Sequence, residues 1–139
     1  MEERITRDTL LMGVAKLVSK RSTCTRLQVG CVIAMDGRII STGYVGAPSG
    51  VPHCDHTNCG PDNPCQRTVH AEAGAISYAA RSGIKLEGAT LYCTHQPCLK
   101  CSQLIINSGI ARVVYDTPYR DRSGSDLLGS VGIPVEKYE

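Results

Sequence analysis

Two short segments of the sequence carry side chains that suit a metal ion. One reads HAE over residues 70–72, and the other reads PCLKC over residues 97–101. One neutral imidazole and two thiolates are good ligands for Zn²⁺, and three protein ligands leave a fourth position for water, as in catalytic zinc sites. We therefore expect His70, Cys98 and Cys101 to hold a catalytic zinc ion.

Glu72 gives this expected site its chemistry. Zn²⁺ with two thiolates is close to neutral, so a nearby base is needed to help ionise water. We expect Glu72 to be that base, to pass the proton to a ring nitrogen of the substrate and later to protonate the departing ammonia. The pattern H-x-E followed by P-C-x-x-C is a known signature of zinc-dependent nucleobase deaminases. The alternative is a closed structural zinc site with Glu72 as an ordinary surface acid, but such sites normally have four protein ligands.

Both halves of this motif are expected at the N-terminal ends of helices. Pro97 suits the first helical position, where its missing N–H is no loss, so we expect a helix over 97–108. Cys98 and Cys101 are then at i and i+3 and face the same side. A helix N-terminus also favours thiolates, because the helix dipole is positive there.

The rest of the chain predicts an α/β order of elements. Asp36-Gly37 fits a two-residue hairpin turn, because both residue types tolerate positive φ. In the second half strands alternate with helices, which predicts parallel strands covered by helices. The expected elements are, in order, a helix over 6–20, strands over 28–35 and 38–44, a helix over 70–82, a strand over 89–94, a helix over 97–108, a strand over 112–115, a helix over 121–129 and a strand over 131–135.

Residues 45–68 form a long segment with little apolar periodicity. So long a loop is unusual in a compact domain unless something holds it in place. We expect a second, structural zinc ion there, with His56 as a possible substitute for one cysteine ligand. The expected ligands are Cys24, Cys54, Cys59 and Cys65. The alternative is a set of reduced thiols in a mobile loop. Cys31 and Cys93 lie in apolar strands and are expected in the core.

Composition narrows the class of protein. A length of 139 residues fits one domain over 1–139, and the absence of Phe and Trp leaves Val, Ile, Leu and Ala to form its core. A net charge of +2 without a basic run argues against a nucleic-acid-binding surface. The N-terminal sequence has no apolar signal segment, and no stretch approaches membrane-spanning length. We therefore expect a cytoplasmic protein whose eight cysteines bind metal rather than form disulfides.

The sequence resembles the deoxycytidylate deaminase family, within the cytidine deaminase superfamily, over nearly its whole length. The segments that carry the resemblance are RSTCTRLQVG (21–30), GRIISTGYVGAP (37–48), HCDHTNC (53–59), CQRTVHAE (65–72), AARSG (79–83), PCLKC (97–101) and SGIARVVY (108–115). The resemblance implies a three-layer α/β/α sandwich with a five-stranded mixed sheet, and a homohexamer. It also implies a hydrolase that acts on the C–N bond of a cyclic amidine and converts dCMP and water to dUMP and ammonia.

Residue by residue, the resemblance assigns zinc ligation to His70, Cys98 and Cys101 and proton transfer to Glu72. It further implies five substrate contacts, of which the two arginines are expected near the nucleotide phosphate, because the forked donors of Arg suit phosphate. The five are Arg26, Tyr44, Ala71, Arg81 and Tyr115.

Two positions depart from the family pattern. Val45 and Gly74 stand where the family usually has Asn, and the first of these Asn residues is associated with nucleotide recognition and with regulation by dCTP. Val45 cannot hydrogen-bond to a sugar hydroxyl. The departure predicts a changed substrate, such as a modified cytosine nucleotide, or the loss of regulation by dCTP.

Two other interpretations remain open at this point. The first is a deaminase of the same superfamily that acts on a free base, a nucleoside or a tRNA base. A tRNA enzyme is expected to have a basic surface or tail, and the C-terminal VEKYE is not basic. The second is a zinc-binding module without catalytic activity, against which the intact Glu72 argues.

Overall fold

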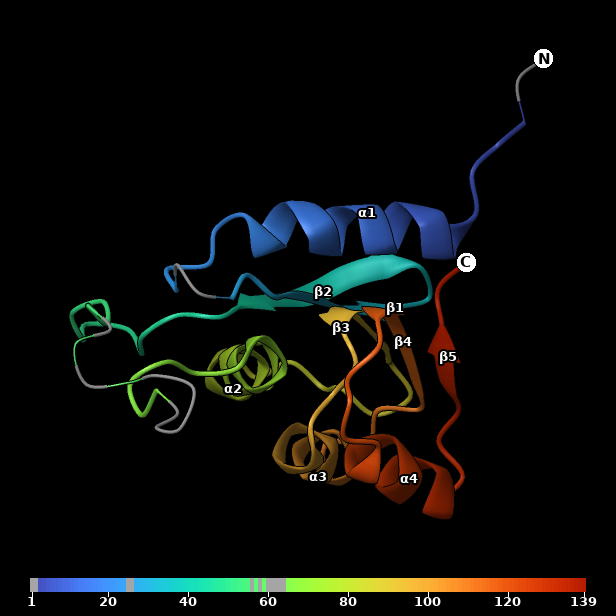
Figure 1. Cartoon of the computed structure of the whole chain (residues 1–139). Helices are drawn as coiled ribbons and strands as arrows, with labels where there is room; N and C mark the ends of the chain where they lie inside the picture. The colour runs from blue at the N-terminus through green and yellow to red at the C-terminus, as the bar shows by residue number, and fades with distance from the viewer. Residues whose placement is uncertain (1–2, 25–26, 56, 58, 60–64) are drawn as a thin grey trace.

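A five-stranded mixed β-sheet forms the middle layer of the molecule, and helices cover both of its faces (Figure 1). The computed structural model describes residues 3–24, 27–55, 57, 59 and 65–139. The strands are β1 (Gly30–Met35), β2 (Arg38–Tyr44), β3 (Thr90–His95), β4 (Arg112–Thr117) and β5 (Val135–Lys137). The sheet order is β2-β1-β3-β4-β5; β1 is antiparallel to both neighbours, whereas β3, β4 and β5 are parallel. The expected α/β/α sandwich is confirmed.

One helix, α1 (Arg7–Ser19), covers one face of the sheet. Thr6 is the N-cap residue of α1, and its side-chain oxygen accepts a hydrogen bond from the Thr9 N–H at 3.1 Å. The buried side chains of α1 recur at helical spacing and pack against β1, β3 and β4. Together they form a core of Leu11, Met12, Ala15, Val32, Ala34, Tyr92 and Val114.

Three helices cover the other face: α2 (Ala71–Ser82), α3 (Leu99–Asn107) and α4 (Ser123–Ser130). The core on this side includes Cys31 and Cys93, which are paired across β1 and β3 and are 0% exposed, so their expected core position is confirmed. In the described part of the chain, no helix combines the length and the apolarity needed to cross a membrane.

The close approach of α2 to the sheet sets the position of its N-terminal end. Ala71, Ala75 and Ala79 are fully buried and four residues apart, so one small-residue stripe of the helix lies on the sheet. Gly43 of β2 allows this approach, because a Cβ atom there would collide with the carbonyl oxygen of Ala71.

The ends of two elements show how Gly and Pro interrupt strands. The expected hairpin turn between β1 and β2 is confirmed, with φ of 52° at Asp36 and 78° at Gly37. The strand predicted over 131–135 is wrong in position, since β5 begins only at Val135. Gly132 has φ of 82°, and Pro134 has no N–H to donate, so the chain turns before it pairs with β4.

Arg112 joins α1, β4 and β5 through charged hydrogen bonds. Its guanidinium donates to both carboxylate oxygens of Asp8 at 3.0 and 2.8 Å and to Oε2 of Glu136 at 2.9 and 2.6 Å. The Tyr92 hydroxyl donates to Asp8 at 2.6 Å. The hydrogen bonds from Arg112 lower the pKa of Asp8, and burial together with Asp8 raises the pKa of Tyr92 to about 12.

Replacing Arg112 with Ala is expected to lower the free energy of unfolding by about 1–2 kcal/mol, a value reduced by the partial exposure of these side chains. Because the folded state lowers the pKa of Asp8, this stabilisation is complete above the unfolded-state pKa of about 4 and is lost as pH falls through the lower folded-state pKa. Urea unfolding of both proteins at pH 7 and pH 3 measures the difference, which should shrink at pH 3. Arg38→Ala, on an exposed position of β2, is the matched control. An equal loss in both variants would contradict a special role for Arg112.

Candidate active site

His70 is held in an extended conformation immediately before α2. It is the N-cap residue of the helix, with φ of −64° and ψ of 151°. The preceding residue, Val69, exchanges backbone hydrogen bonds with Gly46 at 2.7 and 3.3 Å, which ties this segment to the end of β2. Within a helix, residues two apart do not face the same side. His70 lies before the first helical turn and Glu72 lies on it, so helical geometry does not direct their side chains apart.

The two cysteines of PCLKC lie at the N-terminal end of α3, directly after the carboxyl end of β3. The expected helix start at Pro97 differs from the structure, since Cys98 is the N-cap with φ of −77° and ψ of 173° and the helix begins at Leu99. The first helical hydrogen bond runs from the Ser102 N–H to the Cys98 carbonyl at 2.9 Å. Cys101 remains three residues from Cys98, so both sulfurs still reach the same place.

The side chains of His70, Cys98 and Cys101 converge. The Nδ1 atom of His70 lies 3.5 Å from the Cys98 sulfur and 3.4 Å from the Cys101 sulfur, and all three potential ligand atoms lie within 4.8 Å of one another. A tetrahedral zinc ion with Zn–N of about 2.0–2.1 Å and Zn–S of about 2.3 Å holds its nitrogen and sulfur ligands about 3.5 Å apart. The residues therefore fit zinc.

The pKa values of the two thiols in this group are shifted in opposite directions. Hydrogen bonds from Cys101 and His70 lower the pKa of Cys98 to about 4, whereas the hydrogen bond to Cys98 and burial raise the pKa of Cys101. The pKa of His70 is raised, chiefly by its hydrogen bond with Cys98. A divalent cation bound here would displace the protons of this group, because thiolate and neutral imidazole are the forms that bind metal.

Glu72 lies buried beside this group. Its side chain is on the first turn of α2 and the residue is only 5% exposed. Burial raises the pKa of its carboxyl group, while a hydrogen bond with its own backbone N–H and the charge of His70 act in the opposite direction. A carboxyl group with a raised pKa is suited to both accepting and donating a proton near neutral pH.

A cavity of about 220 Å³ opens beside Glu72 and the His–Cys–Cys group. One part of its wall is apolar, and the other presents polar side chains from the ends of β3 and α2. Its lining residues are Leu27, Val29, Val45, His70, Ala71, Glu72, His95, Gln96, Cys98 and Tyr119. The arrangement can hold a small flat molecule with one polar edge facing Glu72.

Sequence reasoning missed Leu27, Val29, His95, Gln96 and Tyr119 as lining residues. His95 and Gln96 carried a usable signal, because His95 ends β3 and Gln96 follows it immediately before PCLKC, and ligands commonly bind at the carboxyl ends of such strands. Nothing in the local spacing indicated Tyr119.

Gln96 fixes the loop that carries Tyr119. Its Nε2 donates to the Ser125 hydroxyl at 2.5 Å, and its Oε1 accepts the backbone N–H of Tyr119 at 2.8 Å. Gln96 is 5% exposed, so both ends of its buried amide are satisfied by protein groups. Tyr119 is therefore held at the edge of the cavity by its backbone.

The five substrate contacts implied by the resemblance fall in different places. Ala71 lines the cavity beside Glu72. Tyr44 and Arg81 line a separate hollow of about 470 Å³, and Arg81 lies at the far end of α2 from Glu72. Tyr115 lines a third hollow, next to Gln96. Arg26 lies outside the described residues, and all five contacts remain predictions.

The two positions that depart from the family pattern, Val45 and Gly74, line different hollows. Val45 is 6% exposed and lines the cavity beside Glu72, where it adds to the apolar wall. Gly74 lines the hollow shared by Tyr44 and Arg81, and an added Cβ there would meet no atom closer than 4.0 Å. The departure at Val45 therefore bears on the cavity, and the departure at Gly74 on the separate hollow.

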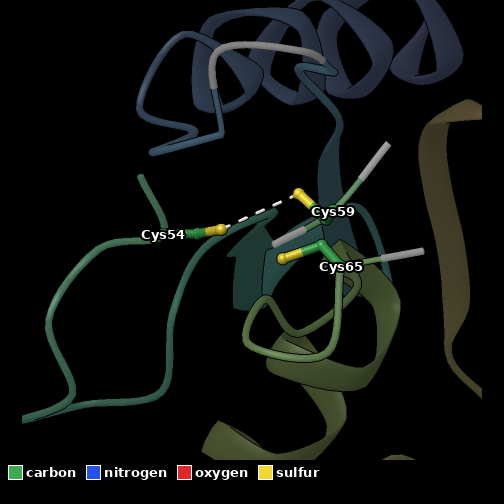
Figure 2. Close-up of side chains that lie close together, drawn as sticks. All are labelled: Cys54, Cys59 and Cys65. Atoms are coloured by element: carbon green, nitrogen blue, oxygen red, sulfur yellow. Dashed lines mark hydrogen bonds between the residues drawn. The ribbon is translucent and has the colours of Figure 1, made fainter. Parts of the chain in front are cut away.

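A second group of cysteines lies in the segment before α2 (Figure 2). The sulfurs of Cys54, Cys59 and Cys65 point toward one another and lie within 4.8 Å of one another, with 4.0 Å between Cys54 and Cys59. Hydrogen bonds with Thr68 contribute most to lowering the pKa of Cys65, to about 6. None of the eight cysteines, all of which belong to the described residues, is in a disulfide.

Cys24, the fourth ligand expected for this second group, does not join the other three cysteines. Cys24 is 7% exposed and packs in the apolar core that includes Val29 and Val45. It does not belong to the three-sulfur group, and His56 lies outside the described residues. The structure thus brings together three of the four cysteines that were expected to bind a structural zinc.

The α/β/α sandwich with a His–Cys–Cys group at two helix N-termini is a cytidine deaminase-like fold. The family model described as "Cytidine and deoxycytidylate deaminase zinc-binding region" matches residues 5–117. The chain belongs to this family.

Individual relatives agree with this assignment. ComE operon protein 2 of Bacillus subtilis is 39% identical over 139 residues, which cover 99% of this chain and 74% of that protein. Deoxycytidylate deaminase of Schizosaccharomyces pombe is 36% identical over 94% of this chain, which spans only 44% of that relative's length. The crystal structure of dCMP deaminase from the cyanophage S-TIM5 in complex with dCMP and dUMP is 33% identical, with a TM-score of 0.87, and the match covers 99% of this chain and 100% of that chain.

Proposed function

We propose that this chain catalyses the zinc-dependent hydrolytic deamination of dCMP to dUMP and ammonia. The observation that carries the proposal is the convergence of His70 Nδ1 and the sulfurs of Cys98 and Cys101 at zinc-ligand distances, beside a buried Glu72 and a cavity. Membership of the deaminase family and the similarity to a structure that contains dCMP and dUMP support it.

The residues of the chain divide the chemistry among them. Zn²⁺ held by His70, Cys98 and Cys101 would lower the pKa of water and so supply the nucleophile at neutral pH. Glu72 accepts a proton as water attacks C4 of the cytosine, and delivers it to ring nitrogen N3. Glu72 then takes the second proton from the new C4 hydroxyl and delivers it to the 4-amino group, which leaves as ammonia when the C–N bond breaks and the C4 carbonyl forms. The apolar wall, which includes Val29 and Val45, excludes other water from the ring.

Comparison of substrates tests this proposal. Ammonia release is measured with dCMP, CMP, deoxycytidine, cytosine, guanine and 5-methyl-dCMP at equal concentrations, with and without dCTP and Mg²⁺. The proposal predicts that dCMP has the highest kcat/KM. A higher kcat/KM for 5-methyl-dCMP would favour the modified-nucleotide alternative, and activity with a free base alone would contradict the proposal. Strong multiplication of dCMP turnover by dCTP would show that Val45 does not abolish regulation.

We also propose a second, structural zinc ion at Cys54, Cys59 and Cys65. Three sulfurs within 4.8 Å and the lowered pKa of Cys65 support metal binding. For the fourth ligand the sequence-based prediction stays Cys24, with His56 as the substitute. The homohexamer, the single domain over 1–139 and the cytoplasmic location stay predictions.

Native mass spectrometry counts the zinc ions. Two ions per chain are expected in the wild type and one in Cys59→Ser, because loss of one of four ligands leaves an incomplete structural site. Comparing Cys24→Ser with His56→Ala identifies the fourth ligand by which of them loses the second ion. One zinc ion per wild-type chain would contradict the second site.

A further inference from the structure

His95 lies at the carboxyl end of β3 and lines the cavity beside Glu72. Side chains alternate between the two faces of a strand, so His95 belongs to the same face as Leu91 and Cys93, which pack in the core beneath α2. The residue is neither a ligand in the His–Cys–Cys group nor a partner of Glu72 in the described structure. Its imidazole is half-buried. The hydrogen bonds of the ring explain why a polar side chain lies at this position.

A chain of hydrogen bonds fixes the protonation of this ring. The backbone N–H of Gly30 donates to Thr94 Oγ1 at 3.1 Å, and Thr94 Oγ1 lies 3.1 Å from His95 Nδ1. In the described structure these are the two hydrogen bonds of the Thr94 hydroxyl, which is 6% exposed. Since the oxygen already accepts from Gly30 and a buried hydroxyl proton needs an acceptor, that proton goes to His95 Nδ1.

The ring is therefore neutral, and its own proton is on Nε2. Burial also lowers the pKa of His95, which agrees with a neutral ring. Within the described residues, no hydrogen-bond partner satisfies Nε2. The apolar part of the cavity wall offers no acceptor, and the amide of Gln96 is hydrogen-bonded to Ser125 and Tyr119 rather than to His95.

We propose that His95 contacts the substrate, donating a hydrogen bond from Nε2–H to an uncharged oxygen of the nucleoside part, and that Thr94 is the positioning residue that holds this tautomer. The inference rests on the proposed function, because it assigns a further contact within the same site. A neutral donor suits a carbonyl or sugar oxygen, whereas phosphate is usually bound by charged donors. The carboxylate of Asp116 also places negative charge near this ring, which disfavours a phosphate.

Kinetics of substituted proteins give the first test. His95→Ala is expected to lower kcat/KM for dCMP by about 10- to 100-fold, the usual effect of losing one hydrogen bond in a desolvated site. His95→Gln, which keeps an N–H donor, should recover part of the loss. Thr94→Val should lower kcat/KM while Thr94→Ser, which keeps the hydroxyl, should not. Wild-type rates in both His95 variants would overturn the proposal.

Nitrogen-15 NMR of the zinc-loaded protein gives a readout that does not depend on turnover. The His95 signals, assigned by their loss in His95→Gln, should show the proton on Nε2, and saturating dUMP or deoxyuridine should shift Nε2. A proton on Nδ1, or an Nε2 signal that neither ligand changes, would overturn the proposal. A shift produced by inorganic phosphate but not by deoxyuridine would overturn the assignment to an uncharged oxygen. If the wild type formed no dUMP from dCMP, the proposed function would fail, and this measurement would still decide whether His95 contacts a nucleoside.

Discussion

Replacing Glu72 with Gln is expected to lower kcat for dCMP by about 10²–10⁴-fold, the usual contribution of a general acid–base residue. Gln has nearly the same shape as Glu but cannot accept or deliver the proton. The buried position of Glu72 suits the neutral amide, because burial already penalises the charged carboxylate there. Zinc content and thermal unfolding temperature should therefore stay near the wild-type values, while ammonia release falls.

Glu87→Gln is the matched control for this prediction. Glu87 is an exposed acid, and its ion pair with Lys85 at 3.8 Å is also exposed, so its substitution should change neither turnover nor stability. Wild-type turnover in Glu72→Gln would remove Glu72 from its assigned role. Loss of zinc in that variant would show instead that Glu72 supports the metal site.

The second large effect is expected from Cys98→Ala. Removing one of three protein ligands leaves His70 and Cys101, so zinc affinity should fall by more than the 10- to 100-fold typical of losing an outer partner of a ligand, about 10²-fold or more. The number of zinc ions per chain should drop by one, and turnover should fall to background. Zinc is measured by mass spectrometry after dialysis, and dUMP formation is measured on the same sample.

Leu99→Ala tests whether any change at this helix start has the same effect. Leu99 is the neighbouring residue, at the first position of α3, and is 39% exposed. Its truncation should leave both zinc and turnover intact. Full zinc occupancy in Cys98→Ala would contradict the ligand assignment, since two protein ligands do not make a tight zinc site.

The elements that were predicted well are those whose signals lie close together in the sequence. The Asp36-Gly37 turn places its own strands, and Gly83 ends α2 with φ of 70° as expected of a helix C-cap. The start of α3 was misplaced by two residues, because an extended Cys98 cannot be distinguished from a helical one by residue type. The last strand was misplaced because Val131 has strand propensity but follows α4 directly, and Gly132 turns the chain after it.

The candidate site shows the same division. His70, Glu72, Cys98 and Cys101 sit in two short motifs whose residue types already suit zinc chemistry, so their convergence could be predicted. The cavity wall could not, because Val29, Val45 and Tyr119 come from separate segments that only the folded sheet brings together. The orientation of His95 depends on a hydrogen bond between Thr94 and Gly30, which are 64 residues apart.

Turnover of dCMP in H₂¹⁸O tests the central claim most directly. The zinc-loaded wild type is incubated with dCMP, and the product is analysed by mass spectrometry beside a chelator-treated sample and a sample reloaded with zinc. Hydrolytic deamination predicts dUMP that carries one ¹⁸O atom, equal amounts of ammonia, loss of product after chelation and its return with zinc. No dUMP from the zinc-loaded protein, or undiminished formation after the zinc has been removed, would contradict the account.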